Sequence, residues 1–398
     1  MIKNIKKNKE IIAWSLYDFA NQPFTTLIVT FIFSAFFTES LAINNQVGTS
    51  LWSLGISITA IFVALMSPFL GALADSGGYR KVFLMISTYL CIVSTVCLYF
   101  FEPNQTYNIL GVEFDVAIIS LIVFVIANIG FEFGTVFCNS YLSDLATNIN
   151  MGKISGYAWG LGFVGGLISL AVSFICLDLS ETLNIRLINL LVAAWLFIFS
   201  IPTFIFLKDT KPNKGLHKYF KQSFESIISS FRNVREHKKI VRFLIARLFY
   251  NDALITIFAF GGIYAAGTLQ FSFNEILVLG VVLNIAACIG SFLFGNLEDK
   301  IGVKKMLMIT LLVLLFSTLL AFFAPLLTNF EHSITPKTLF WIAGVLIGLM
   351  QGPNQAGSRS LMARLTPEEK KNEFFGFYAF SGKATAFVGP LFFGLLTS

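Results

Sequence analysis

Ionisable and amide side chains interrupt several long apolar stretches of this sequence at helical spacing. Asp18, Asn21 and Gln22 fall at positions i, i+3 and i+4 of one stretch, and Asn128 and Glu132 fall at i and i+4 of another. This spacing places the side chains of each stretch on one face of a helix. Polar groups within apolar helices are costly unless they face an interior, so these stripes predict a polar cavity that binds a solute or a coupling proton.

Three later stretches carry polar side chains of the same kind, and the candidates there are Arg247, Asn251, Asp252, Gln351, Asn354, Gln355 and Lys383. For a single Asn or Gln, the alternative is a hydrogen bond between helices worth about 0.6 to 2 kcal/mol. A buried carboxylate such as Asp18, Glu132 or Asp252 either pairs with a cation or accepts a proton during transport. For Lys383 an ion pair is favoured over substrate contact, because small residues share its face and bring a neighbouring helix close.

The composition indicates whether water or lipid surrounds the helices that carry these polar residues. Of 398 residues, 56% are hydrophobic and 13% are charged, and the mean hydropathy is +0.77. Such a chain cannot fold with a wet exterior, so the lipid bilayer is its solvent. We expect eleven spans, namely 11–37, 51–73, 82–101, 115–138, 154–177, 187–207, 243–266, 275–297, 306–327, 339–357 and 374–396.

The distribution of the 28 Lys and Arg residues predicts the orientation. With the N-terminus in the cytoplasm, 24 of them lie in cytoplasmic segments, including ten between Lys208 and Arg242 and four between Arg359 and Lys371. This pattern follows the positive-inside rule and gives no support to a nucleic-acid partner. All five Cys fall within spans and all three His in loops, so neither a metal site nor another cofactor is indicated.

A loop motif occurs twice, 224 positions apart. Residues 71–81 and 295–305 share the pattern G-x-L-x-D-x-x-G-x-[RK]-K, and each copy lies between the second and third spans of its half. We interpret the motif as a gating latch, in which an Asp is held by helix N-termini or basic side chains beside a turn that Gly permits. The alternative is a turn whose charges only fix the topology. The candidate latch residues are Gly71, Asp75, Gly78, Arg80, Gly295, Asp299, Gly302 and Lys304.

The doubled loop resembles the signature loop of the major facilitator superfamily, along essentially the whole chain. The segments 14–21, 139–142, 154–157 and 348–383 resemble its vacuole-effluxer-like branch, which includes fungal vacuolar amino-acid exporters and many bacterial permeases. The resemblance implies an all-α integral membrane protein of two six-helix repeats, with helices one, four, seven and ten lining a central cavity.

The repeat also defines the expected organisation. Residues 1–207 form the first half, 208–242 a basic cytoplasmic linker, and 243–398 the second half. At the offset of 224, the partner of span 187–207 would fall near 411–431, so we expect the twelfth helix to be absent from this chain.

Together these features predict a monomeric multi-pass protein of the cytoplasmic membrane. We expect a secondary active transporter that moves a small polar solute, with amino acids as the suggested class, by alternating access coupled to protons or another gradient. The alternatives are a non-transporting membrane sensor and an inactive truncated permease. An enzyme is disfavoured, because no Ser/His or metal constellation lies in the spans.

Overall fold

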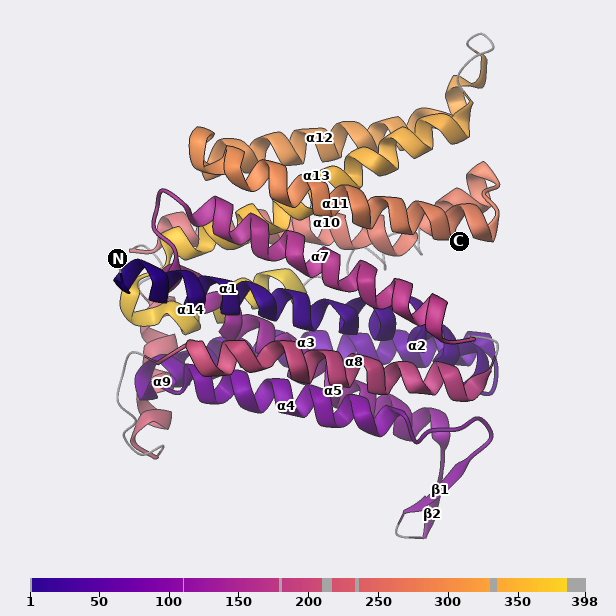
Figure 1. Ribbon diagram of the computed structural model, residues 1–398, viewed down its shortest axis with the longest axis horizontal. Helices are drawn as coiled ribbons and strands as arrows, with labels where there is room; N and C mark the ends of the chain where they lie inside the picture. The colour runs from indigo at the N-terminus through magenta and orange to yellow at the C-terminus, as the bar shows by residue number, and fades with distance from the viewer. Residues whose placement is uncertain are drawn as a thin grey trace.

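The computed structural model describes residues 2–109, 111–178, 181–209, 217–232, 236–329 and 335–384. Figure 1 shows most of these residues in long helices that run side by side along one axis. The N-terminus, α9 (His217–Arg232) and α14 (Lys371–Lys383) lie at the same end of this bundle, at the left of Figure 1. This end is called the N-terminal face below.

Helices of the first half form the lower part of the bundle in Figure 1. The elements are α1 (Ile2–Pro23), the π-helical η1 (Phe24–Phe31), α2 (Phe33–Phe36), the π-helical η2 (Phe37–Leu41), α3 (Asn45–Gly77), α4 (Arg80–Leu98), α5 (Val116–Ser140), α6 (Leu142–Leu145), α7 (Met151–Cys176) and α8 (Thr182–Phe206). Between α4 and α5 an antiparallel hairpin pairs β1 (Thr106–Ile109) with β2 (Val112–Asp115).

The second half follows α9, and its described part consists of five helices with short 3₁₀ segments between them. Its elements are α10 (Lys238–Leu269), α11 (Phe273–Ile301), α12 (Val303–Phe323), the 3₁₀ helix η3 (Ala324–Asn329), α13 (Pro336–Leu365), the 3₁₀ turn η4 (Glu368–Lys370) and α14. The helix ends repeat at the offset of the sequence motif, since α3 ends at Gly77 and α11 ends at Ile301, 224 positions later.

Local sequence signals set several of these helix ends. The Asn44 side chain accepts a hydrogen bond from the Val47 N–H at the start of α3. Ser272 and Glu275 form a capping box at the start of α11, and Thr335 caps α13, with Pro336 at its first position. These N-cap residues fix the first residue of each helix, and the apolar residues that follow make the helix suited to cross a membrane.

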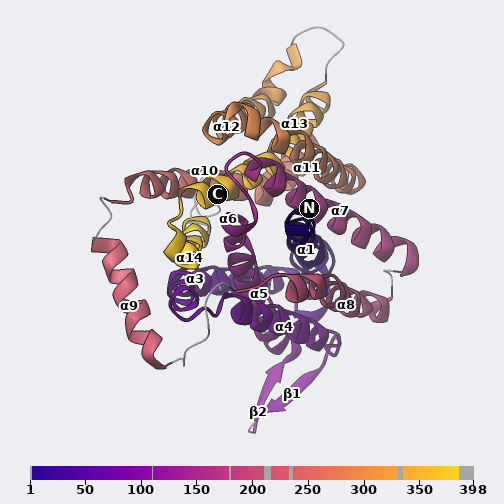
Figure 2. The ribbon, with the colours of Figure 1, turned by 60° about the vertical axis from the view of Figure 1, so that its left-hand side comes forward.

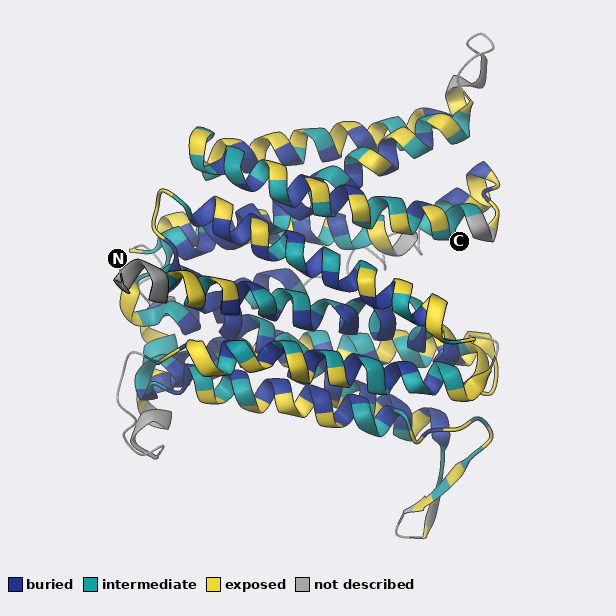
Figure 3. Ribbon diagram, viewed as in Figure 1, coloured by how far each residue is buried: buried dark blue, intermediate teal, exposed yellow. Residues whose placement is uncertain are grey.

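The outer surface of the bundle is apolar. Eight helices among the described residues are long and apolar enough to cross a membrane. Their outward sides carry large exposed side chains such as Leu65, Leu293 and Leu312, each more than 60% exposed, and exposed positions lie along the helix exteriors in Figure 3. Such surfaces are stable in lipid rather than in water. The chain is therefore a multi-pass membrane protein.

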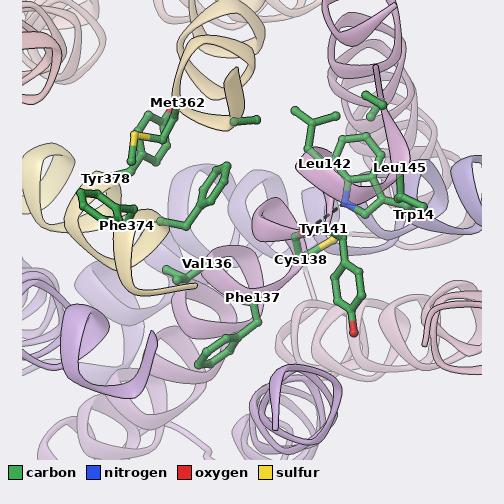
Figure 4. Close-up of a cluster of buried hydrophobic side chains, with 14 of the residues drawn as sticks. Trp14, Val136, Phe137, Cys138, Tyr141, Leu142, Leu145, Met362, Phe374 and Tyr378 are labelled. Atoms are coloured by element: carbon green, nitrogen blue, oxygen red, sulfur yellow. Dashed lines mark hydrogen bonds between the residues drawn. The ribbon is translucent and has the colours of Figure 1, made fainter. Parts of the chain in front are cut away.

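The two halves meet in one buried cluster near the N-terminal face (Figure 4). Trp14 and Tyr141 of the first half pack in this cluster with Met362 and Phe374 of the second. The Trp14 indole N–H also donates a hydrogen bond to the Cys138 carbonyl oxygen, at 2.8 Å. In the largest contacts between the halves, α14 packs against α3 and α7 packs against α11.

The structure differs from the sequence-based expectation in three places, namely at the hairpin, at span 339–357 and in the predicted linker, where α9 is a helix. The hairpin between α4 and α5 was not predicted. The span predicted at 339–357 is a helix that continues to Leu365, so Arg359 lies inside α13 rather than in a loop. The span predicted at 374–396 begins within α14, and its residues 385–396 lie outside the described part of the chain.

Candidate functional site

Asp75, the carboxylate of the first loop motif, caps a helix of the opposite half. It lies in the last turn of α3, and its Oδ1 accepts hydrogen bonds from the Asn372 backbone N–H (3.1 Å) and side-chain amide (2.7 Å). Its Oδ2 accepts the Glu373 N–H at 2.8 Å. Both residues belong to the first turn of α14, where backbone N–H groups lack helical partners and the dipole is positive. The cap therefore joins α3 of the first half to α14 of the second.

Two glycines of the motif permit this contact. Gly71 lies one turn before Asp75, and a Cβ atom there would come within 2.2 Å of the Asn372 carbonyl oxygen. Gly78 ends α3 with φ of +69°, a left-handed conformation that favours glycine. The first glycine lets α14 approach α3, and the second ends α3 directly after the cap.

The second copy of the motif makes the reciprocal contact. Asp299, near the end of α11, accepts hydrogen bonds from the Gly152 N–H (2.9 Å) and the Lys153 N–H (2.8 Å) at the start of α7. A Cβ atom at Gly295 would lie 3.0 Å from the Cα of Gly156, also in α7. Gly302 has φ of +91°. Each half thus caps one helix of the other half through the same motif position.

Arg80, the arginine of the first loop, binds an acidic residue of its own half. The Arg80 guanidinium binds Asp144 at 2.7 Å and lies 3.6 Å from the centre of the Tyr141 ring. Asp144 also binds the Lys371 ammonium, at 2.5 Å. Arg80 is therefore connected to Lys371 of the second half through Asp144.

In the second loop, Lys304 is exposed and makes no ion pair with any described residue. The cation beside Asp299 is Arg364 of α13, whose Nη2 lies 3.0 Å from Asp299 and 3.4 Å from Glu298. Arg364 also donates to the Asn148 carbonyl of the first half. The structure thus places Arg364 beside Asp299, and a latch role for Lys304 stays a prediction.

Arg359 makes the most deeply buried ion pair between the halves. It belongs to α13, only 2% of its side chain is exposed, and its Nη1 lies 2.7 Å from the Asp18 carboxylate of α1. The same nitrogen donates to Asn139 Oδ1 at 3.0 Å. The guanidinium also donates to the Ser155 hydroxyl and carbonyl oxygens, and it lies 4.7 Å from the Trp14 ring. Helices α1, α5 and α7 of the first half thus surround a cation of the second.

Another ion pair joins the halves deeper in the bundle. Lys383 Nζ lies 2.6 Å from Glu132 Oε1, between α14 and α5. The side chains are 32% and 16% exposed, so this pair is more accessible than the pair of Asp18 and Arg359. Two of the predicted ionisable candidates therefore lie together, and each is matched by a charge of the other half.

Arg247 and Asn251 of α10 bind α14 rather than the first half. Arg247 donates to the Tyr378 carbonyl (2.8 Å) and the Ser381 hydroxyl (3.0 Å), and Asn251 donates to the Gly382 carbonyl at 3.0 Å. These bonds hold the helix that carries Lys383. Asp252, the next residue, is half-buried.

The remaining amide candidates are spread along their helices. Asn354 is fully buried and donates to Thr310 of α12, so it binds within its own half. Gln22 lies against α7, where a Cβ atom at Gly166 would approach its Cγ. Asn21 and Asn128 are buried. Gln351 and Gln355 are half-buried in α13.

Sequence reasoning missed the cations Arg359 and Arg364 as site residues. The available signal was the segment Ser358-Arg359-Ser360-Leu361, which continues the polar stripe of α13. The span predicted from hydropathy, 339–357, ends before this segment.

Comparisons with known proteins identify the fold and the family. A family model described as vacuole effluxer Atg22 like matches residues 44–398. The chain belongs to this Atg22-like family. The match includes both copies of the loop motif and all of α13 and α14, and so it covers both halves of the cap arrangement.

Relatives of this Atg22-like protein agree with the assignment. The uncharacterised MFS-type transporter YxiO of Bacillus subtilis is 27% identical over 402 residues, which cover 98% of this chain and 88% of YxiO. Autophagy-related protein 22-1 of Penicillium rubens is 24% identical over 262 residues, which cover 62% of this chain and 44% of the fungal protein. The match thus spans less than half of that fungal relative.

Solved structures show the fold. The proton:xylose symporter XylE superposes with a TM-score of 0.72 at 14% identity, over 99% of this chain and 89% of XylE. The human organic anion transporter MFSD10 superposes with a TM-score of 0.70, also at 14% identity, over 97% of this chain and 92% of MFSD10. The fold is that of the major facilitator superfamily, and the Atg22-like protein is a transporter of this type and not an enzyme.

Proposed function

We propose that the Atg22-like protein is a secondary active transporter of a small polar solute that works by alternating access, with its N-terminal face in the cytoplasm. The excess of Lys and Arg in the segments at this face supports the orientation. Each hydrogen bond or ion pair between the halves, among the described residues, has a partner within about 20 Å of its own helix end at this face, counted at 1.5 Å per residue. Such an arrangement supports a state closed toward the cytoplasm.

The observation that carries the proposal is the pairing of charges between the halves. Opening the N-terminal face has to separate Asp18 from Arg359 and Glu132 from Lys383. A carboxylate that loses its cation in a low-dielectric interior is stabilised by a proton or by a cationic group of the solute. Asp18 and Glu132 are therefore the residues that we assign to coupling.

The same charges favour a zwitterionic solute. An α-ammonium group can take the place of Lys383 or Arg359 beside a carboxylate, and an α-carboxylate can bind the cation that is released. The resemblance to a branch that includes vacuolar amino-acid exporters points to the same class. Amino acids are thus the solutes to test first.

Reconstitution of the purified chain in liposomes tests the proposal. We expect a pH gradient to drive accumulation of labelled amino acids, and we expect Asp18→Asn and Glu132→Gln to abolish this accumulation. Glu113→Gln, which changes an exposed carboxylate of the hairpin, is the matched control and should transport normally. Flux that ignores the pH gradient and is equal in all variants contradicts the coupling, and flux restricted to other solutes contradicts the solute class.

A further inference from the structure

Helix α9 lies across the N-terminal face instead of along the bundle. Figures 1 and 2 both show it running crosswise to the long helices, at the edge of the molecule. It packs against α3, which is one of the candidate membrane spans. The helix is therefore placed where the end of a spanning helix meets the membrane surface.

One side of α9 consists of serines that face the protein. Ser223 and Ser230 are buried and Ser226 is half-buried, at positions i, i+7 and i+3 of one helical face. Ser226 donates a hydrogen bond to Glu373 Oε2 at 2.6 Å, and Ser230 donates to Glu373 Oε1. Lys370 Nζ donates to the Ser230 hydroxyl at 2.9 Å. The side of the helix toward the protein is thus polar.

Glu373 connects α9 to the cap of α14. Its side chain is fully buried and binds the serines of α9, while its backbone N–H donates to Asp75. Glu373 therefore binds α9 through its side chain and the Asp75 carboxylate of α3 through its backbone N–H. A displacement of α9 removes the two serine partners of this buried carboxylate next to the cap, while Lys370 stays 3.9 Å from it.

The apolar side of α9 faces away from the bundle. Phe224 is 61% exposed and Ile228 is 37% exposed, and these two residues lie one turn apart. Ile227 beside them is half-buried, while Gln222, Glu225 and Ser229 are exposed on a third side. In water this arrangement would bury serines and expose a phenylalanine, which is unfavourable. At a membrane surface, by contrast, Phe224 and Ile228 lie in the lipid while the exposed polar side lies in water.

The charge of the segment around α9 indicates which kind of membrane surface the helix binds. Segment 208–242 contains ten Lys and Arg residues and three acidic residues, a formal excess of seven positive charges. Basic segments next to a membrane span are attracted to anionic lipid headgroups. The occupant that fits both the apolar side and this charge is an anionic leaflet.

We propose that α9 is an interfacial helix whose Phe224 and Ile228 insert into an anionic leaflet, and whose Ser226 and Ser230 hold Glu373, so that lipid binding by α9 stabilises the cap between Asp75 and α14. The inference does not depend on which solute is transported. It gives the linker a role as a membrane-bound strap across the N-terminal face.

Hydrogen exchange on the full chain in nanodiscs tests the inference. The probes are bilayers of phosphatidylcholine alone and of phosphatidylcholine mixed with phosphatidylglycerol. We expect amides of residues 222–230 to exchange about tenfold more slowly in the anionic bilayer, and the α14 amides at 372 and 373 to slow in parallel. Exchange in α4 and α5 serves as the check that each variant is folded.

Variants separate the two sides of α9. The double variant Phe224→Ser/Ile228→Ser should lose the lipid dependence at both sites, whereas the matched control Gln222→Ala/Ser229→Ala should keep it. Ser226→Ala/Ser230→Ala should keep slow exchange in α9 but lose the parallel slowing in α14. Equal exchange in the two bilayers, or a Phe224→Ser/Ile228→Ser variant that behaves like its control, overturns the inference.

Discussion

The Asp18 carboxylate and the Arg359 guanidinium lie 2.7 Å apart, although 341 positions separate them in the sequence. Taking both ions out of water costs several kcal/mol each, and only good geometry and further hydrogen bonds offset this cost. Here Asn139 and Ser155 supply those bonds. The pair is stable as long as the two halves stay together at the N-terminal face, and it has to break when they separate.

Removal of either partner should therefore destabilise the protein strongly. We expect Arg359→Gln or Asp18→Asn to lower the free energy of unfolding by about 3–5 kcal/mol, because each leaves a buried charge or a buried polar group without its partner. The double variant should lose about 1–3 kcal/mol less than the sum of the single variants. Denaturant unfolding in detergent micelles gives the double-mutant cycle, and strictly additive losses would contradict direct pairing.

The caps predict a change in the distance between the halves. Asp75→Ala should cost roughly 1 kcal/mol, the usual value for a helix cap, and should favour separation of α14 from α3. Spin labels at the exposed positions Ile149 and Lys304, one in each half, report this separation. We expect longer distances in the variant than in the parent.

A control for the caps exists within the first half. Asp115 caps α5 by accepting the Ala117 N–H at 2.8 Å, and both residues belong to one half. Asp115→Ala should lose similar stability but leave the distance between the labels unchanged. If both variants change the distance alike, the effect of Asp75 is general destabilisation rather than gating.

Much of the fold follows from the sequence, because its signals are local or periodic. The motif offset of 224 predicts matched helix ends, and α3 and α11 end 224 positions apart. The structure places Asp75 at a helix N-terminus, one of the two arrangements that the motif suggests, and the gating role of this contact stays a prediction. The periodicity of a single helix, however, carries no information on which residue of the other half lies opposite.

The cations show this limit most clearly. From hydropathy alone the tenth span is predicted to end at Gly357, because the charged residue that follows favours a loop when its ion-pair partner is not known. Arg359 lies inside α13 since Asp18 neutralises it there. Likewise Lys304 is near Asp299 in sequence, whereas Arg364 is near it in space. The hairpin was overlooked as well, although Tyr107, Ile109, Val112 and Phe114 flank Gly111 in an alternating pattern.

The roles of Arg364 and Lys304 at the second loop can be tested directly. Arg364→Ala removes a partly buried cation that binds Asp299 and Glu298, and it should cost about 1.5–3 kcal/mol. Lys304→Ala changes an exposed side chain and should stay within about 0.5 kcal/mol of the parent. Thermal unfolding of the two variants decides between them, and equal losses would restore Lys304 as a latch residue.

The pair of Glu132 and Lys383 should govern the pH dependence of transport. Glu132→Gln cannot gain or lose a proton, so we expect its transport rate to become independent of a pH gradient. The charge reversal Glu132→Lys/Lys383→Glu can form the same ion pair and should recover most of the stability lost in Lys383→Gln. Its coupling should stay impaired, because the carboxylate then lies on α14. Liposome flux and thermal unfolding measure the two effects, and full coupling in Glu132→Gln would exclude this carboxylate.

The motif glycines predict a graded response to one added methyl group. In Gly71→Ala the new Cβ would lie 2.2 Å from the backbone oxygen of Asn372, so α14 has to move away from α3. In Gly295→Ala the nearest atoms lie at 3.0 Å, and a smaller shift suffices. At Gly267 of α10 no atom lies within 4 Å, so Gly267→Ala should be neutral or slightly stabilising.

Overpacking such as that at Gly71 costs about 1–3 kcal/mol. Unfolding temperature and the distance between labels at Ile149 and Lys304 should both change most for Gly71, less for Gly295 and least for Gly267. A Gly71→Ala protein that behaves like Gly267→Ala would show that α3 and α14 are not in close contact.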